Sequence, residues 1–184
     1  MPTLISREEA LARIVAEGGR PECLMCAVLE GRVGALHVVH ADEAQVVMLP
    51  RYVRSWGHVV VVPRAHVTRF GDIDDALWTT LYRTAHRAAR MLEALRAPRR
   101  VYVTSTGSST VELIQSSRHV HIHVIPVYTE DDRPADLFSW QAGVYVGDDA
   151  EWSALRDAYV GWWGVGVPAT RHTGGAGDPH RLRG

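Results

Sequence analysis

Three histidines recur at every second position in the stretch RHVHIHVIP, residues 118–126. They are His119, His121 and His123, and only valine and isoleucine fill the positions between them. Because the side chains of a strand alternate between two faces, this pattern predicts a strand that carries all three imidazoles on one face. Residues on the same face of a straight strand lie about 6.5 to 7 Å apart. That spacing is too long for three imidazoles to bind one small metal ion, so separate tasks for the three side chains fit better.

Imidazole has the properties that phosphoryl chemistry needs. It is nucleophilic when neutral at about pH 7, and its adduct with a phosphoryl group is a phosphoramidate that water can cleave. The plainer alternative is a chance row of histidines on a solvent-facing side of a sheet. Strict alternation beside a hydrophobic face favours the chemical interpretation.

The chain has only two cysteines, Cys23 and Cys26, which form the motif C-L-M-C. In a cytosolic protein this spacing favours metal binding or redox chemistry over a structural disulfide. Two buried, reduced cysteines without a metal are the alternative.

Composition bounds the partners that the chain can bind. Its 184 residues, of which 46% are hydrophobic, suffice for one domain with a substantial core. The formal net charge of -1 gives no general attraction to nucleic acid or to an anionic membrane, so neither partner is expected. All 20 basic residues are arginine, and lysine and asparagine are absent. An anionic ligand must therefore be held by a local site, without a lysine as base or phosphate clamp.

The N-terminal stretch MPTLISREEALARIVAEGG contains no apolar segment behind a basic one, as a secretory signal would. No later run of about 18 apolar residues suits a membrane span. A cytoplasmic location is therefore expected.

Three helices are predicted from capping residues and apolar spacing. Residues 6–19 predict a first helix, in which Ser6 caps the N-terminus and Glu9 completes a capping box. Residues 72–98 have apolar side chains at helical spacing behind a group of aspartates, and predict one long helix. Residues 151–163 predict a short amphipathic helix that docks on the body of the protein.

Alternating and β-rich stretches predict five strands, over residues 36–40, 44–49, 58–63, 100–106 and 119–127. Together with one long helix and one or two short ones, these strands indicate the α+β class. The Gly-rich, charged end of the chain, residues 170–184, is expected to be disordered.

The stretch HVHIHVI resembles the signature of the histidine triad family of nucleotide hydrolases and transferases. Two more stretches are similar to family segments, in the same order along the chain. Residues 57–66, GHVVVVPRAH, resemble the preceding strand with its Gly-His pair, and residues 22–31, ECLMCAVLEG, resemble the Cys-x-x-Cys segment of zinc-containing members. The resemblance covers about residues 22–127. It implies a five-stranded antiparallel sheet and a homodimer that pairs two such sheets.

The resemblance also implies a role for each matched residue. His121 would be the nucleophile on the α-phosphate, and His123 and His58 would contact the phosphate or support the reacting geometry. Gln115 and Ser116 would approach the bridging oxygen or the leaving group. The reaction would be a double displacement through a nucleotidyl-histidine, with water or another phosphate as acceptor.

In zinc-containing relatives the Cys-x-x-Cys pair joins two histidines, one of them two residues before the nucleophile. Carried over to this chain, the ligands are Cys23, Cys26, His66 and His119. Four nitrogen and sulfur ligands form a closed tetrahedral site, so this zinc would be structural. It would tie the N-terminal segment to the strand that carries His121.

Nucleoside recognition departs from the family pattern. Pro50 stands eight residues before His58, where family members usually have Asn or Asp, and the family's Asn-x-Gly stretch appears here as S-T-G. Ser105, Gly107 and Arg51 are the expected nucleotide-binding or phosphate-binding residues. A solvated arginine-rich loop around Arg51 is the alternative.

Residues 1–150 are predicted to form the histidine-triad domain, and residues 151–184 a C-terminal helix and tail. The expected function is cleavage at an α-phosphate, in a dinucleoside polyphosphate, a nucleoside phosphoramidate or a similar substrate. A nucleotide-binding or regulatory module with little catalysis is one alternative. A metal-dependent hydrolase that uses the histidine row for a catalytic metal is another.

Overall fold

The computed structural model describes residues 1–18, 23–32, 37–107, 117–130 and 133–165. In these residues an α+β fold is built from β1 (Thr3–Ile5), α1 (Arg7–Gly18), α2 (Leu24–Leu29), β2 (His37–Ala41), β3 (Gln45–Leu49), β4 (Val59–Pro63), the 3-10 helix η1 (Phe70–Asp72), α3 (Asp75–Arg96), β5 (Arg100–Thr104), β6 (Ile122–Val127), α4 (Pro134–Ser139), β7 (Val144–Val146) and α5 (Asp149–Gly164). The predicted fold class is thereby confirmed. The expected disordered end, residues 170–184, lies outside the described residues.

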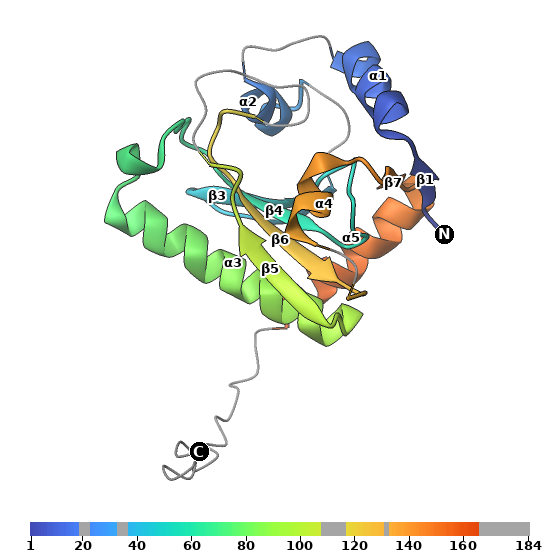
Figure 1. The fold of residues 1–184 in the computed structure, drawn as a ribbon. Helices are drawn as coiled ribbons and strands as arrows, with labels where there is room; N and C mark the ends of the chain where they lie inside the picture. The colour runs from blue at the N-terminus through green and yellow to red at the C-terminus, as the bar shows by residue number, and fades with distance from the viewer. Residues whose placement is uncertain (19–22, 33–36, 108–116, 131–132, 166–184) are drawn as a thin grey trace, which may run out of the picture.

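The main sheet has five strands in the order β2-β3-β4-β6-β5, and every neighbouring pair is antiparallel. Every residue of β4 is buried. Both faces of the sheet are covered, which is why β4 is a continuous apolar run rather than an alternating one. Figure 1 shows α2 and α3 on opposite sides of the sheet.

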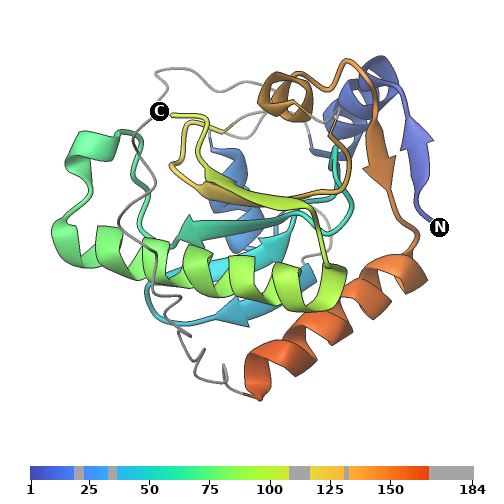
Figure 2. The ribbon, with the colours of Figure 1, turned by 60° about the horizontal axis from the view of Figure 1, so that its bottom comes forward.

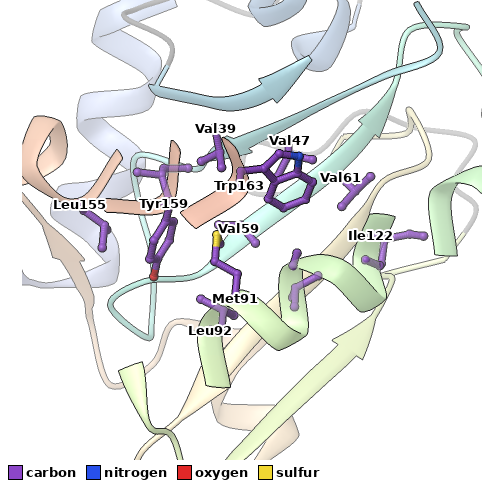
Figure 3. Close-up of a cluster of buried hydrophobic side chains, with 14 of the residues drawn as sticks. Val39, Val47, Val59, Val61, Met91, Leu92, Ile122, Leu155, Tyr159 and Trp163 are labelled. Carbon is purple, nitrogen blue, oxygen red and sulfur yellow. The ribbon is translucent and has the colours of Figure 1, made fainter. Parts of the chain in front are cut away.

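Helices α3 and α5 lie side by side on one face of the sheet (Figure 2). The main core forms between them and the strands, and Figure 3 shows part of it. Val59 and Val61 of β4 point into this core, where they meet Met91 and Leu92 of α3 and Tyr159 of α5. Helix α5 is therefore part of the main core, with four buried side chains, Trp152, Leu155, Tyr159 and Trp163.

Two smaller groups of side chains cover the opposite face. Helix α2 packs on β3 and β4, where Val60 and Val62 are buried against it. Helix α4 packs on β6, where its Leu137 contacts Ile125 and Val127. The alternation along β4 and β6 thus assigns Val60 and Ile125 to one face and Val59 and Val124 to the other. His123 lies on the face of α2 and α4.

A second sheet of two strands, β1 and β7, was not expected from the sequence. Each strand has only three residues, too few to show a period of two. Ile5 of β1 and Val144 of β7 are buried in one cluster with Ala10 of α1, so the small sheet packs against this helix. The predicted cap of α1 is confirmed, since the N–H of Glu9 donates to Oγ of Ser6 at 3.1 Å.

The strand predicted over 119–127 is shorter than expected, because β6 begins at Ile122. His119 and His121 therefore precede the strand, and the prediction of three histidines on one strand is wrong. The segment before β6 is held by other partners. The N–H of Val120 donates to the carbonyl of Val67 at 2.7 Å, outside the sheet. This bond draws the histidine segment toward the loop after β4.

The long helix predicted over 72–98 is α3, with its N-cap at Asp74, whose side chain accepts from the N–H of Leu77 at 2.8 Å. The helix ends at Arg96, and its C-cap, Ala97, adopts the left-handed conformation with φ 44°. In the part of the chain that the structure describes, no helix has the length and apolarity to cross a bilayer.

Candidate active site

His58 and His123 meet on the face of the sheet opposite α3. His58 precedes β4 directly, and His123 is the second residue of β6, opposite Val60 in the antiparallel register. Nε2 of His58 lies 3.0 Å from Nδ1 of His123, within hydrogen-bond distance. The two ring centroids are 5.0 Å apart. Diagonal cross-strand neighbours are within reach of each other when the side chains are long or aromatic, as here.

Burial keeps this pair of imidazoles neutral. It lowers the pKa of His58 from its ordinary 6.5 to about 3, with repulsion from His121 as a second cause. Burial likewise holds the pKa of His123 well below 6.5, with additional repulsion from His58 and His121. A hydrogen bond between two neutral imidazoles needs one donor and one acceptor. Each ring of the pair therefore has one N–H and one nitrogen with a lone pair, and the hydrogen bond between the rings relates the tautomer of one to that of the other.

His121 is held in a defined tautomer. Its Nδ1 lies 2.8 Å from the backbone carbonyl of His119, which can only accept a hydrogen bond. Nδ1 of His121 therefore carries the hydrogen, and in the neutral ring Nε2 carries the lone pair. The side chain is 4% exposed, and its ring centroid lies 4.6 Å from that of His123. The nitrogen suited to attack on phosphorus is thus Nε2 of His121.

Nε2 of His123 is buried and has no hydrogen-bond partner among the described residues. A buried polar atom without a partner is uncommon, and such atoms mark places where a ligand or water binds. The ring of Phe138 on α4 stands edge-on to this imidazole, with centroids 5.5 Å apart. Phe138 therefore forms an apolar wall beside the imidazole that offers the unpartnered nitrogen.

A second cluster brings together two sulfur and two nitrogen atoms, from Cys23, Cys26, His66 and His119, all within 4.8 Å of one another. Sγ of Cys26 lies 3.2 Å from Nδ1 of His66 and 3.5 Å from Nδ1 of His119. Sγ of Cys23 lies 3.7 Å from Nδ1 of His119. Zinc bonds of about 2.0 to 2.3 Å at tetrahedral angles separate neighbouring ligand atoms by about 3.3 to 3.8 Å. The four side chains can therefore hold a divalent metal ion.

Hydrogen bonds and burial around this cluster set the tautomer and the charge of its ligand side chains. Nε2 of His119 donates to the carbonyl of Pro63 at 3.0 Å, so Nδ1 keeps the lone pair that faces the sulfur atoms. The N–H of Cys26 donates to Sγ of Cys23 at 3.4 Å. Burial lowers the pKa of His119 to about 4, so the imidazole is neutral as a metal ligand must be. Burial also raises the pKa of Cys26 to about 11, so its thiolate needs a nearby cation.

The two clusters share a backbone connection. His119 belongs to the metal cluster through its side chain, while its carbonyl fixes the tautomer of His121. Binding of a metal at His119 would therefore hold the peptide that orients the imidazole of His121.

The other residues predicted for the site lie in different parts of the structure. Ser105 and Gly107 follow β5, whose last residue Thr104 pairs with His123. They therefore lie near the beginning of β6, which His121 directly precedes. Arg51 forms an ion pair with Glu17. Gln115 and Ser116 lie outside the described residues.

Two contacts at the site had no signal in the sequence. Phe138 belongs to a helix of six residues that the chain pattern did not predict. Ser117 is buried, with its Oγ 3.9 Å from Sγ of Cys23. A serine two residues before the first triad histidine looks like any loop serine until the fold brings it to the cysteine.

Comparison with known proteins gives consistent matches. The model of the HIT domain family matches residues 34–130, slightly more than half of the chain. An uncharacterized HIT-like protein of Methanocaldococcus jannaschii is 29% identical over 109 residues, which cover 59% of this chain and 81% of that protein.

Two solved structures share the fold. A zinc-bound histidine triad family protein from Mycobacterium smegmatis superposes with a TM-score of 0.58 at 20% identity, over 79% of this chain and 98% of that one. A hypothetical histidine triad nucleotide-binding protein from Sulfolobus tokodaii does so with a TM-score of 0.59 at 19% identity, over 76% of this chain and 90% of that one. At these identities the likeness concerns the fold alone.

Proposed function

The chain belongs to the histidine triad (HIT) family, and on that premise we propose that it is a nucleotide hydrolase or nucleotidyltransferase. The substrate would be a dinucleoside polyphosphate, a nucleoside phosphoramidate or a similar compound, cleaved at an α-phosphate. The observation that carries this proposal is the tautomer of His121. The hydrogen bond from Nδ1 to the carbonyl of His119, at 2.8 Å, leaves Nε2 as the nucleophilic nitrogen.

The reaction proceeds in two displacements. Nε2 of His121 attacks the α-phosphorus, the bond to the bridging atom breaks, and the leaving group departs with that bonding pair. The nucleotide is then held on His121 through a P–N bond. Water or a second phosphate attacks the same phosphorus, the P–N bond breaks, and Nε2 recovers its lone pair, while an attacking water releases one proton to the solvent. Each displacement needs hydrogen-bond donors for the charge that builds up on the phosphoryl oxygens.

His123 supplies one such donor in this proposal. If Nε2–H of His58 donates to Nδ1 of His123, the hydrogen of His123 sits on Nε2, the buried nitrogen without a partner. That N–H can then donate to a phosphoryl oxygen beside His121. The depressed pKa values of His58 and His123 support this neutral relay. His58 acts through His123 and fixes its tautomer.

The remaining roles are carried over from the family. Ser116 and Gln115 assist at the bridging atom or leaving group, and Ser105 and Gly107 contact the nucleotide near the beginning of β6. The ion pair between Arg51 and Glu17 partly offsets the charge of Arg51, so this arginine binds phosphate only if a ligand displaces the carboxylate.

Zinc is the proposed metal of the cluster formed by Cys23, Cys26, His66 and His119. With four protein ligands it supplies no open coordination position, so its contribution is structural. It would hold helix α2 against the segment that carries His121. Free cysteines at this site fit a reducing, cytoplasmic location, which we include in the proposal.

A homodimer is proposed from the edges of the main sheet. Strand β2 is one edge of the main sheet, and helix α5 packs on its face, where His37 stacks on Trp152 and His40 stacks on Trp163. The other edge strand, β5, has no further strand beside it in the described part of the chain. Val103 on β5 is 39% exposed. Pairing of two β5 strands would join the sheets of two copies, and Val103→Arg should shift the protein toward monomer in analytical ultracentrifugation.

The test of the enzymatic proposal is intact-protein mass spectrometry with a panel of dinucleoside polyphosphates, nucleoside phosphoramidates and nucleotide sugars, with product release followed in parallel. The wild type and a His123→Gln variant, in which the second displacement is slowed, are compared with His121→Ala. We expect a nucleotide-sized adduct on His121 and a loss of turnover of at least about 1000-fold in His121→Ala. Full turnover by His121→Ala would refute the proposal. His86→Gln, at an exposed histidine of α3, is the matched control.

One observation favours a second candidate. Pro50 offers no side-chain hydrogen bond where relatives contact the ribose, and the neighbouring Arg51 is paired with Glu17. A nucleotide-binding module with little catalysis would show affinity in calorimetry, no adduct, and no turnover of any compound in the panel.

A further inference from the structure

The turn of residues 55–58, which leads into β4, is held by a hydrogen bond at each residue. Oγ of Ser55 donates to the carbonyl of Pro126 on β6. The N–H of His58 donates to the carbonyl of Ser55 at 3.2 Å. The carbonyls of Trp56 and Gly57 accept from two tyrosine hydroxyls. The turn that these bonds hold ends at His58.

The two hydroxyls come from separate parts of the chain. Tyr128, just after β6, donates to the carbonyl of Trp56 at 2.8 Å. Tyr159 of α5 donates to the carbonyl of Gly57 at 3.0 Å. Arg96, the last residue of α3, donates from Nε to the hydroxyl oxygen of Tyr128 at 3.2 Å. Tyr159 is fully buried, and burial raises its pKa far above the usual value, so its hydroxyl remains a donor at any ordinary pH.

Gly57 is fitted to the hydroxyl of Tyr159. Its φ of +102° lies in the region that favours glycine. A Cβ at this position would stand 2.6 Å from the hydroxyl oxygen of Tyr159. The backbone of the turn and the tip of Tyr159 are therefore in direct contact, with no room for a side chain between them.

The indole of Trp56 fixes the other side of the turn. Its ring centroid lies 4.3 Å from that of Trp152 on α5. A Cβ at Gly147 would lie 2.5 Å from the Trp56 ring, so the backbone before α5 also closes on this indole. Helix α5 thus contacts the turn through both Trp152 and Tyr159.

We propose that Tyr159 and Tyr128 are positioning residues that fix the imidazole of His58 against His123. The carbonyl of Gly57 and the N–H of His58 belong to one planar peptide. Tyr159 holds the oxygen end of that plane, and the carbonyl of Ser55 holds the nitrogen end. With both ends held, this peptide and the Cα of His58 are fixed in place. Strand β4 begins at the next residue, Val59, and fixes the backbone on the other side of that Cα. Together these restraints set the direction of the Cα–Cβ bond, from which Nε2 reaches Nδ1 of His123.

This assigns a task to a helix outside the part of the chain that matches the family, since Tyr159 lies beyond residues 34–130. The effect on turnover rests on the proposed function. The effect on the His58 ring does not, because it concerns only a contact between two imidazoles in the protein itself.

The experiment compares Tyr159→Phe and Tyr128→Phe with Tyr82→Phe. Each change removes one hydroxyl and keeps the ring, and Tyr82 lies on the exposed surface of α3, 40% exposed. Long-range proton–nitrogen spectra of protein labelled in its histidine rings report the tautomer of each imidazole. Kinetic constants on any compound that the wild type turns over are measured for the same three variants.

In Tyr159→Phe we expect the ring signals of His58 and His123 to shift or split, while those of His66 stay unchanged. We expect kcat to fall about tenfold with KM within about twofold, because loss of orientation affects the reacting geometry more than binding. Tyr128→Phe should act in the same direction. Ring signals and kcat equal to those of Tyr82→Phe would overturn the proposal. If the wild type turns nothing over, the enzymatic proposal fails, and the ring spectra alone decide the positioning role.

Discussion

Nε2 of His58, directly before β4, and Nδ1 of His123 on β6 lie 3.0 Å apart, and burial keeps both rings neutral. Acid should therefore destabilise the folded protein through this pair of imidazoles. Protonation of either ring would place a charge in a buried site, and protonation of the accepting ring would also put a second hydrogen between the two nitrogen atoms. The folded protein resists this protonation, whereas the unfolded chain does not.

The first prediction follows from that difference in proton uptake. The folded pKa of His58, about 3, lies below the ordinary 6.5, so the contribution of His58 is fully favourable above pH 6.5 and is lost progressively as the pH falls toward 3. In this window each histidine that stays neutral in the folded protein lowers the free energy of unfolding by about 1.4 kcal/mol for each pH unit that the pH falls. Urea unfolding between about pH 7 and pH 4.5 should show a smaller slope for His58→Gln than for the wild type.

The exposed His86 gives the control for this slope. His86→Gln should keep the wild-type slope, since its ring does not lie in the buried pair. Acid release of a bound metal would act on all three proteins alike, so the difference between slopes isolates His58. Equal slopes for His58→Gln and His86→Gln would show that the imidazole pair is not protected from protonation.

The second prediction concerns the metal. Purified protein should contain one zinc per chain, and removal by a strong chelator should lower Tm by about 10 °C or more, with loss of turnover in parallel. Cys23→Ser should reproduce both effects, and Glu30→Gln, at the exposed end of α2, should reproduce neither. Loss of turnover with an unchanged Tm would instead indicate a catalytic metal.

The third prediction concerns Phe138. Truncation in Phe138→Ala exposes the ring of His123, and because burial is the main cause of its lowered pKa, this pKa should rise toward 6.5. We expect kcat to fall about tenfold as the apolar wall is lost. Histidine-ring titration by NMR measures the pKa. Leu95→Ala, which truncates an exposed side chain of α3, should leave both quantities unchanged.

The fourth prediction tests the division of the chain at residue 150. Trp152 is 4% exposed and belongs to the main core, so Trp152→Ala should lower the free energy of unfolding by about 3 to 5 kcal/mol. Val160→Ala, on the exposed side of the same helix, should cost less than about 1 kcal/mol. Two separate unfolding transitions, with the first alone sensitive to Trp152, would support an independent C-terminal unit.

Much of the fold could be predicted because its long elements carry a clear period. The apolar spacing behind Asp74 identified α3, and the continuous valine run identified β4 as a strand. The start of β6 was misplaced because alternation continues through His119 and Val120, whereas their hydrogen bonds go to Pro63 and Val67. Such partners are far away in sequence, and no local pattern shows them.

The residues of the candidate site were predicted from the sequence, but the contacts between them were not. Family resemblance named His58 and His123, but their hydrogen bond depends on the diagonal register of β4 and β6, which only the folded sheet defines. The support from Tyr159 joins positions 102 residues apart. A single tyrosine in a helix carries no sign of that partner.

Both edge strands of the main sheet, β2 and β5, have no further strand beside them in the described residues, and α5 packs on the face of β2. If two copies pair through β5, each contributes the same edge, so the contact is complete once two chains have met. Such a pair has twofold symmetry, and growth of the joined sheet by strand addition would have to continue at β2.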